Sequence, residues 1–298
     1  MGDLRFEPID ARRNLLGEGP FWDAEAARLY MVDIVGREVL YRTGLSCKVW
    51  RLLQPVSAAI PRARGGLIVT LPDGAYFFDP DNGRLSRFVQ TEPDISGNRA
   101  NEARTDVRGR LWIGTMQNNI AADGAPLPVE RSSGTLSLVD GSGRCKRLLS
   151  GIGIANTLCW SPAGDRLYFA DSLAGVIYSF ACDLDSDVLS DRRIFSDVSG
   201  YGVPDGSAID EAGYLWNARW GAACIIRFAP SGTIDRVFPV PVTQPTSCVF
   251  GGRELNWLYT TSAQHGLSPQ QLRVNPLEGA TLCAETDIRG ERCHRFAG

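Results

Sequence analysis

The chain has 298 residues, 44% of them hydrophobic and 22% charged, and its formal net charge is −3 at pH 7. These values are ordinary for a globular protein and exclude a disordered, collagen-like or coiled-coil chain. Lysine and arginine number 31 against 34 aspartate and glutamate residues, with no sustained basic run, so we expect no nucleic-acid partner. The first residues do not read as a secretory signal, and no apolar run nears the ~18 residues of a membrane span. We therefore expect a cytoplasmic protein with no membrane partner.

A short phrase recurs six times along the chain, in which a turn rich in Asp and Gly precedes a β-prone run centred on leucine. In chain order, the copies occupy residues 22–34, 63–70, 106–115, 161–171, 210–219 and 250–261. The intervals between their central leucines run from 38 to 56 residues, close to the ~40–50 residues of a four-stranded propeller blade. Further β-rich runs that end in turn residues lie between the copies, as in hairpins. The pattern predicts an all-β fold, a six-bladed β-propeller, formed by residues 1–298 as a single domain.

Other stretches carry weaker signals. The longest irregular stretch, Gln117–Ser133, follows the third copy, and we predict a lid or rim loop there. Eight cysteines are dispersed without a Cys-x-x-Cys pair, which favours reduced, mostly buried thiols over zinc or redox motifs. GxSxG, HExxH and P-loop motifs are absent, and neither His265 nor His294 stands in a recognisable catalytic context.

Polar residues stand in Gly-, Pro- or Asn-rich segments directly ahead of several copies of the phrase. These residues are Glu18, Arg99, Asn101, Asn156 and Asp205. If the blades are equivalent, the segments meet at one end of the central channel. Two carboxylates and an amide oxygen then form a hard-oxygen site for a divalent cation, with positions open to water and substrate. Taken singly, each residue is better explained as a turn-former or a surface charge, so the prediction depends on their joint recurrence.

Several stretches, taken as an ordered set, carry a family resemblance. They include LGEGPFWD, NRANEARTDVRGRLWIGTM, ANTLCWSPAGDRLYFADS and VPDGSAIDEAGYLWNARW. The chain resembles the senescence marker protein / gluconolactonase / regucalcin-like family of six-bladed β-propellers over nearly its whole length. The resemblance implies a divalent metal held by Glu18, Asn156 and Asp205. Calcium, zinc, manganese, magnesium and Fe(II) all remain candidates, because each can occupy an oxygen-rich site.

The same resemblance implies substrate contacts from Arg99 and Asn101, with Glu102 standing where the family has Asp. The loop after the Gly-Thr-Met run often supplies an acidic substrate contact in the family. This chain has amides there, and Asn118 is the expected contact, because amides hydrogen-bond sugar hydroxyls as donor and acceptor. Arg219 is a further candidate contact, although strand alternation leaves open whether it is buried or exposed.

The resemblance implies hydrolysis of a sugar-acid lactone, an aldonolactone, to the aldonic acid in bacterial-type sugar catabolism, with Asp205 as the catalytic base. A small-molecule sugar lactone is then the expected partner, and no oligomeric state is predicted. Two alternatives remain: a non-enzymatic calcium-binding regulatory propeller, and a phosphoester or organophosphate hydrolase on the same metal. A binding protein saturates its metal with protein oxygens, whereas a hydrolase leaves coordination positions open.

Overall fold

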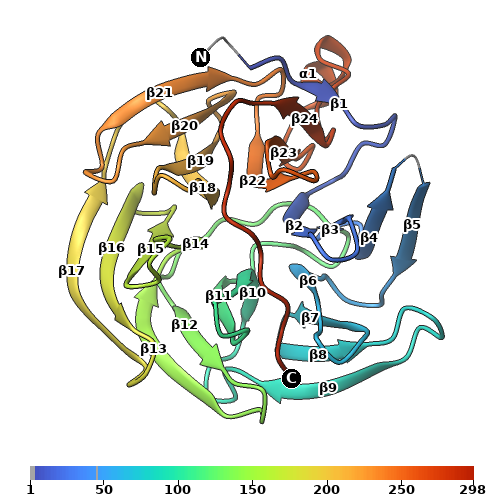
Figure 1. Ribbon diagram of the computed structural model, residues 1–298. Coiled ribbons are helices and arrows are strands. Elements are labelled where there is room, and N and C mark those ends of the chain that lie inside the picture. The colour runs from blue at the N-terminus through green and yellow to red at the C-terminus, as the bar shows by residue number, and fades with distance from the viewer. Residues whose placement is uncertain (1–3, 45) are drawn as a thin grey trace.

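The computed structural model describes residues 4–44 and 46–298. These residues form six four-stranded antiparallel sheets arranged as blades around a central channel (Figure 1). The six-bladed β-propeller predicted from the repeated phrases is confirmed. All eight cysteines are unpaired, as the sequence favoured.

Each blade has an inner strand beside the channel, two middle strands and an outer strand. The inner strands of blades 1 to 6 are β2 (Gly17–Asp23), β6 (Ala58–Pro61), β10 (Asn98–Thr105), β14 (Ala155–Trp160), β18 (Val203–Ile209) and β22 (Pro245–Gly251). The second strands are β3 (Arg28–Asp33), β7 (Leu67–Leu71), β11 (Leu111–Gln117), β15 (Arg166–Asp171), β19 (Leu215–Trp220) and β23 (Trp257–Ser262). The third strands are β4 (Glu38–Thr43), β8 (Gly74–Phe78), β12 (Gly134–Val139), β16 (Val176–Asp183), β20 (Cys224–Phe228) and β24 (Leu282–Glu285). The outer strands are β5 (Ser46–Arg51), β9 (Leu85–Gln90), β13 (Cys145–Ile152), β17 (Val188–Ser196), β21 (Ile234–Pro239) and β1 (Glu7–Pro8).

Burial follows the position of a strand within its blade. The second strands β7 and β11 are almost wholly buried, whereas the outer strands β5 and β9 are largely exposed. A middle strand lies between two neighbouring blades, so both of its faces need apolar or small side chains. This is why the leucine-centred runs, which form the second strands, read as nearly continuous hydrophobic segments.

The Asp–Gly turn of the repeated phrase has a direct structural role. The carboxylate of Asp106 accepts backbone N–H groups within its own turn and the indole Nε1–H of Trp112 at 2.9 Å. Asp210 repeats this arrangement with Trp216, also at 2.9 Å. Gly109 closes the first turn with φ 69°, a left-handed conformation that favours glycine. One aspartate therefore joins the turn to the buried tryptophan of the second strand.

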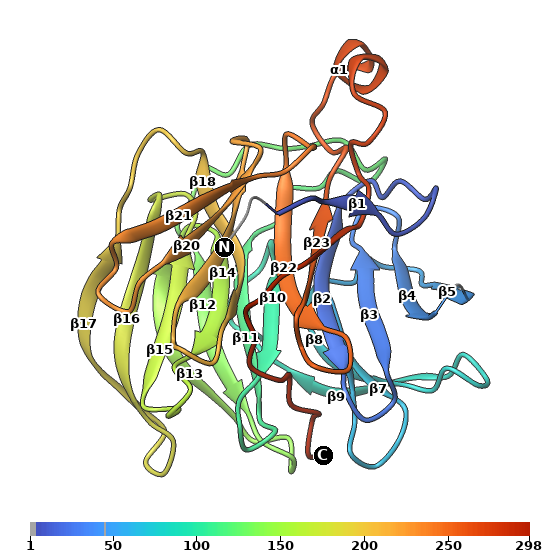
Figure 2. The same cartoon turned by 45° about the horizontal axis from the view of Figure 1, so that its top comes forward.

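The two chain termini close the ring. β1, near the N-terminus, is the outer strand of blade 6, in the order β1-β24-β23-β22. Residues 287–298, here called the C-terminal strap, cross the centre of the ring (Figure 1) and bridge Arg62 of blade 2 through Phe296. The helix α1 (Pro269–Val274) projects beyond the ring at one end, and the C-terminus lies at the other (Figure 2). Within the described residues, no helix is long and apolar enough to cross a membrane.

Candidate functional site

One position near the start of each inner strand is equivalent in all six blades, as the pairing with the second strand shows. Directly before it stand the cross-strand pairs Gly17↔Asp33, Ala155↔Asp171 and Pro204↔Arg219 in blades 1, 4 and 5. Five inner strands break their register with the second strand at or beside this position, and the sixth, β6, pairs regularly. Such bulges re-aim side chains. In blades 1 to 6 the position is occupied by Glu18, Ala59, Asn101, Asn156, Asp205 and Thr246.

A cavity of about 210 Å³ opens at this end of the channel, here called the site end. The structure brings five of the residues singled out in the sequence to its wall: Glu18, Arg99, Asn101, Asn156 and Asp205. They are distant in sequence and belong to blades 1, 3, 4 and 5. The ring therefore gathers them because equivalent positions of the blades face the same end of the channel.

The segments leading into β2 and β14 are each held by an aspartate at the end of the second strand. The carboxylate of Asp33 accepts the backbone N–H groups of residues 15–16 at 2.8 and 3.0 Å. Asp171 accepts those of residues 153–154 at 2.9 and 3.1 Å. Both aspartates thus fix the backbone two residues ahead of a candidate metal ligand.

Arg219 has the place in blade 5 that these aspartates have in blades 1 and 4, but it donates hydrogen bonds to the backbone, whereas the aspartates accept them. Its guanidinium is 1% exposed and donates to the carbonyl oxygens of Val198, Tyr201 and Gly202, at 3.3, 2.8 and 3.2 Å. Those residues lead into the strand that carries Asp205. Arg219 is therefore placed behind the wall of the cavity, holding the loop before Asp205, and not on the surface where a substrate contact was expected.

The two carboxylates of the cavity have few partners. Among the described residues, Glu18 accepts only the N–H of Gly19, and Oδ1 of Asp205 is buried without a hydrogen bond. Burial and the nearby charge of Glu102 raise the pKa of Glu18 to about 8. Burial and the charges of Glu18 and Glu102 raise the pKa of Asp205 well above its ordinary value. Among the described residues, neither carboxylate forms a salt bridge, although the charges of Arg99 and Arg219 lower the pKa of Glu18 and Asp205 respectively.

This donor set fits a hard divalent cation. Uncompensated buried carboxylates are costly, and a cation removes that cost. The amide oxygen of Asn156 is held by Asn101, whose Nδ2 donates to it at 3.2 Å, and its own Nδ2 donates to Oγ of Ser172 at 2.9 Å. Within the described residues no three Asp, Glu, His or Cys side chains gather as a metal site. The third oxygen here is an amide, so the set is two carboxylates and one carboxamide.

A donor group faces the carboxylates across the cavity. Nε and Nη2 of Arg99 both donate to Oδ1 of Asn119, at 3.0 and 2.8 Å, and Nη1 donates to Oδ1 of Asn101 at 2.7 Å. Burial lowers the pKa of Arg99 to about 10, so the group is still charged at neutral pH. The guanidinium is thus held rigidly by neutral amides.

Two other expected substrate contacts lie away from the wall of the cavity. Asn118 forms a local turn with Ile120, donating from Nδ2 to its carbonyl at 2.9 Å, and its neighbour Asn119 faces the cavity. Glu102 is 4% exposed and lies deeper in the channel, with Oε1 at 3.9 Å from Nε of Arg104. The difference arises because the side chain that reaches Arg99 depends on the path of the loop after β11.

His265 is a cavity residue that sequence reasoning set aside. It lies in the connection between β23 and β24, and its Nε2 is 3.1 Å from the carbonyl oxygen of Gly124. The Gln117–Ser133 loop and the β23–β24 connection therefore meet at this end of the ring. Burial lowers the pKa of His265, so the ring is neutral at pH 7 and Nε2 carries the proton donated to Gly124. No motif in the sequence around His265 predicts its contact with Gly124.

Thr157, directly after Asn156, is the second residue that sequence reasoning missed. Its φ of 49° is unusual for a β-branched residue. Its hydroxyl donates to the carbonyl oxygen of Asp205 at 2.5 Å, and Asn217 donates to the same carbonyl at 2.9 Å. A strained residue next to Asn156 therefore connects blade 4 to the backbone of Asp205 in blade 5.

Fold and site together define a class: a six-bladed propeller with an oxygen-rich polar cavity at one end of its channel. The family model described as the SMP-30/Gluconolactonase/LRE-like region matches residues 16–264, and the chain belongs to this family. Regucalcin of Oryctolagus cuniculus is 30% identical over 100% of both chains. L-arabinolactonase of Azospirillum brasilense is 35% identical over 96% of this chain and 93% of that protein. The crystal structure of a calcium-binding protein, regucalcin, from Agrobacterium tumefaciens has a TM-score of 0.91 at 27% identity, covering 100% of this chain and 98% of that one.

Proposed function

We propose that this protein is a metal-dependent lactonase that hydrolyses a sugar-acid lactone to the open aldonic acid. The observation that carries the proposal is a cavity in which two buried carboxylates and an amide oxygen face a rigid arginine–amide donor group. Membership of a family in which a 35% identical relative is named L-arabinolactonase supports it. A volume of about 210 Å³ suits a single small ring, because pockets for drug-sized ligands begin near ~300 Å³.

Glu18, Asn156 and Asp205 would hold a divalent cation. When bound, this cation supplies Lewis-acid stabilisation of the negative charge that develops on the lactone carbonyl oxygen. Calcium is the first candidate, since all three ligands are oxygens and a structural relative is described as calcium-binding. Three protein oxygens leave part of the 6–8-fold coordination of Ca²⁺ to water and substrate, which favours a hydrolase over a pure calcium-binding protein.

Asp205 is the proposed general base. It takes one proton from the attacking water as the water oxygen bonds to the carbonyl carbon. The ring C–O ester bond then breaks, and the proton returns to the departing alkoxide oxygen, so that water is consumed and the open acid is released. The unpartnered, buried Oδ1 of Asp205 suits this role, because an oxygen that accepts no hydrogen bond from the protein is open to the proton of a water molecule.

Arg99 and Asn101 orient the substrate. Among the described residues, hydrogen bonds to Ala100, Asn101 and Asn119 use four of the five N–H groups of Arg99 and hold its plane in place. A fixed donor of this kind lowers the entropic cost of reaching the attack geometry. The hydrogen bonds of the guanidinium go to neutral oxygens, so its positive charge is available to neutral or anionic sugar lactones. The eight unpaired thiols favour a reducing, cytoplasmic compartment.

The test is proton release from a panel of neutral and anionic aldonolactones, corrected for spontaneous opening. We expect fast hydrolysis by calcium- or manganese-loaded protein and none above background after chelation. Stoichiometric cation binding without acceleration of any lactone would contradict the proposal and favour a binding protein. A parallel panel of phosphoesters would show whether the cation serves that chemistry instead.

A further inference from the structure

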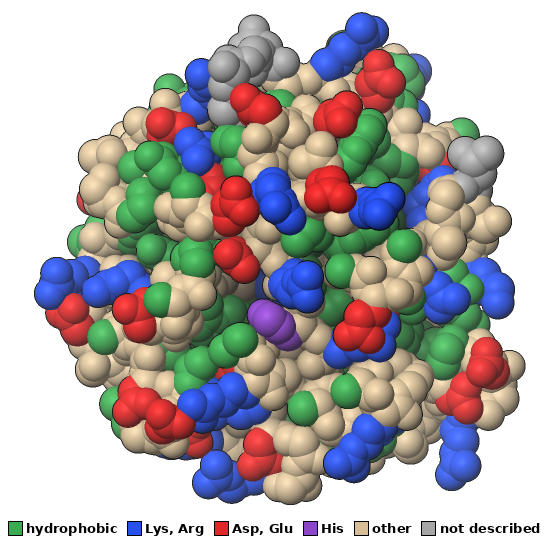
Figure 3. Space-filling view, in the orientation of Figure 1, with side chains coloured by type: hydrophobic (Ala, Val, Ile, Leu, Met, Phe, Trp, Pro, Cys, Tyr) green, Lys and Arg blue, Asp and Glu red, His purple; other side chains and the backbone are tan. Residues whose placement is uncertain are grey.

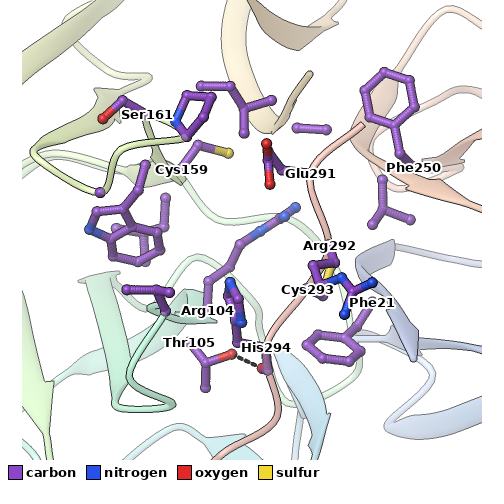
Figure 4. A pocket seen from close by; sticks show the side chains of 18 of the residues that line it. Phe21, Arg104, Thr105, Cys159, Ser161, Phe250, Glu291, Arg292, Cys293 and His294 are labelled. Atoms are coloured by element: carbon purple, nitrogen blue, oxygen red, sulfur yellow. Dashed lines mark hydrogen bonds between the residues drawn. The ribbon is translucent and has the colours of Figure 1, made fainter. Parts of the chain in front are cut away.

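A second cavity, of about 310 Å³, lies at the opposite end of the channel, here called the strap end. Figure 4 shows side chains from the far halves of the inner strands around it, together with the strap residues Glu291 to His294. Its volume is within the range of small-molecule sites. No residue of the proposed lactonase site contributes to its wall.

The strap covers this cavity and is anchored on both sides of it. On one side, the N–H of Gly290 donates to Leu255 at 2.9 Å and that of Glu291 to Ile209 at 3.0 Å. On the other side, the N–H of Phe296 donates to the carbonyl oxygen of Pro61 at 2.9 Å, and the N–H of Ala63 donates to the carbonyl oxygen of Phe296 at 2.8 Å. The hydroxyl of Thr105 also donates to the carbonyl of the strap between these anchors. The cavity is therefore preformed, which lowers the cost of ligand binding.

Most of the wall is apolar. It includes Phe21, Leu158, Ile209, Val249 and Phe250. Cysteine thiols complete it, and burial raises the pKa of both thiols in the wall, so they are neutral. A wall of this kind favours an apolar body and offers a polyol few hydrogen-bond partners.

Arg104 is the charged group at the inner end of this cavity. Figure 4 shows its side chain extending into the space between Cys159 and the strap. The side chain is 16% exposed, and among the described residues its one hydrogen bond runs from Nη2 to the carbonyl oxygen of Cys248, at 3.3 Å. A guanidinium has five N–H donors, so most donors of Arg104, which lines the cavity, have no hydrogen-bond acceptor among the described residues.

The counter-charge of Arg104 is incomplete. The nearest carboxylate, Glu102, is 3.9 Å away, and its Oε1 already accepts the N–H of Ala103 at 3.0 Å. Burial also raises the pKa of Glu102. Glu291 and Arg292 of the strap both line the cavity, and burial lowers the pKa of His294. A buried cation without a full partner is costly, and an anion in the cavity would remove that cost.

We propose that the strap-end cavity binds a small organic carboxylate with an apolar, ring-sized body, whose carboxylate pairs with Arg104. The apolar wall excludes sugars and free phosphate as well-matched ligands, because both would lose hydration there without replacement. Basic and acidic side chains are interspersed over the face of Figure 3. Recognition is therefore assigned to the cavity and not to a charged surface.

The experiment compares benzoate with benzamide, which have the same shape and differ in charge. Calorimetric titrations use chelated protein, so that no cation at the site end can bind the carboxylate. We expect saturable binding of benzoate with a Kd below about 1 mM and at least tenfold weaker binding of benzamide. Arg104→Met removes the charge at similar length, and we expect it to abolish the tenfold preference.

Ala163→Trp is a second variant, which keeps Arg104 and narrows the cavity from an exposed turn. We expect it to weaken both ligands at least fivefold, so the proposal can be tested even if Arg104→Met does not fold. Absence of saturable benzoate binding, or equal affinity for benzoate and benzamide, would overturn the proposal. So would benzoate binding that Arg99→Met removes and Arg104→Met retains, because the anion would then occupy the site end.

Discussion

The site end and the strap end of the channel are formed by the same inner strands but have opposite chemistry. At the site end, the strands begin with Glu18, Asn156 and Asp205, and Oδ1 of Asp205 is buried without a hydrogen bond among the described residues. At the strap end, they finish in apolar side chains around Arg104, a buried cation whose nearest carboxylate, Glu102, is 3.9 Å away. Glu102 lies between, within the electrostatic reach of both.

The difference shows what a repeated scaffold leaves free to vary. Strand pairing and blade packing constrain the middle strands on both faces, whereas the inner strands line the two cavities at the ends of the channel. Segments outside the blades complete each end of the channel. The Gln117–Ser133 loop contacts His265 at the site end, and the C-terminal strap covers the strap end. One fold thus presents a cation site and an apolar cavity along a single axis.

Asp205→Asn should impair catalysis at the site end and leave the strap-end cavity unchanged, and it has the largest expected effect. Loss of the general base and of one ligand charge should lower kcat for the best lactone by about a thousandfold. Benzoate affinity should stay within twofold of the parent. Steady-state kinetics and calorimetry measure the two effects, with the exposed Asp81→Asn as matched control. Retention of more than a tenth of kcat would contradict the assignment of Asp205.

Cation binding at the site end should depend strongly on pH. The pKa of Glu18 is raised to about 8 in the folded, metal-free protein, so below pH 8 a cation must displace a proton. The apparent Kd for Ca²⁺ should therefore fall at least tenfold per pH unit from pH 6 to 8, since the pKa of Asp205 is raised as well. Benzoate affinity should change less than twofold over this range, because Arg104 stays protonated. Calorimetry across pH tests both, and a flat calcium profile would contradict the first.

Arg219→Met would test whether a residue behind the cavity positions Asp205. Losing the hydrogen bonds to the loop before β18 should weaken Ca²⁺ binding by about tenfold, as for other groups that orient metal ligands. The exposed Arg193→Met is the control. A lower melting temperature with unchanged calcium affinity would show a role in stability alone.

Arg99→Ala should affect the substrate more than the cation. A group that binds substrate and transition state equally raises KM without changing kcat, and we expect KM to rise about tenfold with kcat within threefold. Initial rates over a range of lactone concentrations separate the two constants. A large fall in kcat at constant KM would assign Arg99 to the transition state instead.

Much of the site was predictable because it depends on blade equivalence. Glu18, Asn156 and Asp205 each precede a repeated phrase, and closing the ring brings them to one cavity. The same pattern left the place of Arg219 open, because alternation along a strand cannot tell a guanidinium in the cavity from one that holds a loop behind it. Asn118 and Asn119 are adjacent, and the path of the loop alone decides which faces Arg99.

The sequence by itself determined the number of blades, the strand order and the position in each blade from which polar groups enter the channel. These follow from local features: turn chemistry, leucine-centred strands and their spacing. Only the tertiary structure decided which charges are buried without partners, since burial and distance depend on all six blades at once. For the same reason the contact of His265, the strained Thr157 and the cavity around Arg104 became visible only when the ring was closed and the strap lay across it.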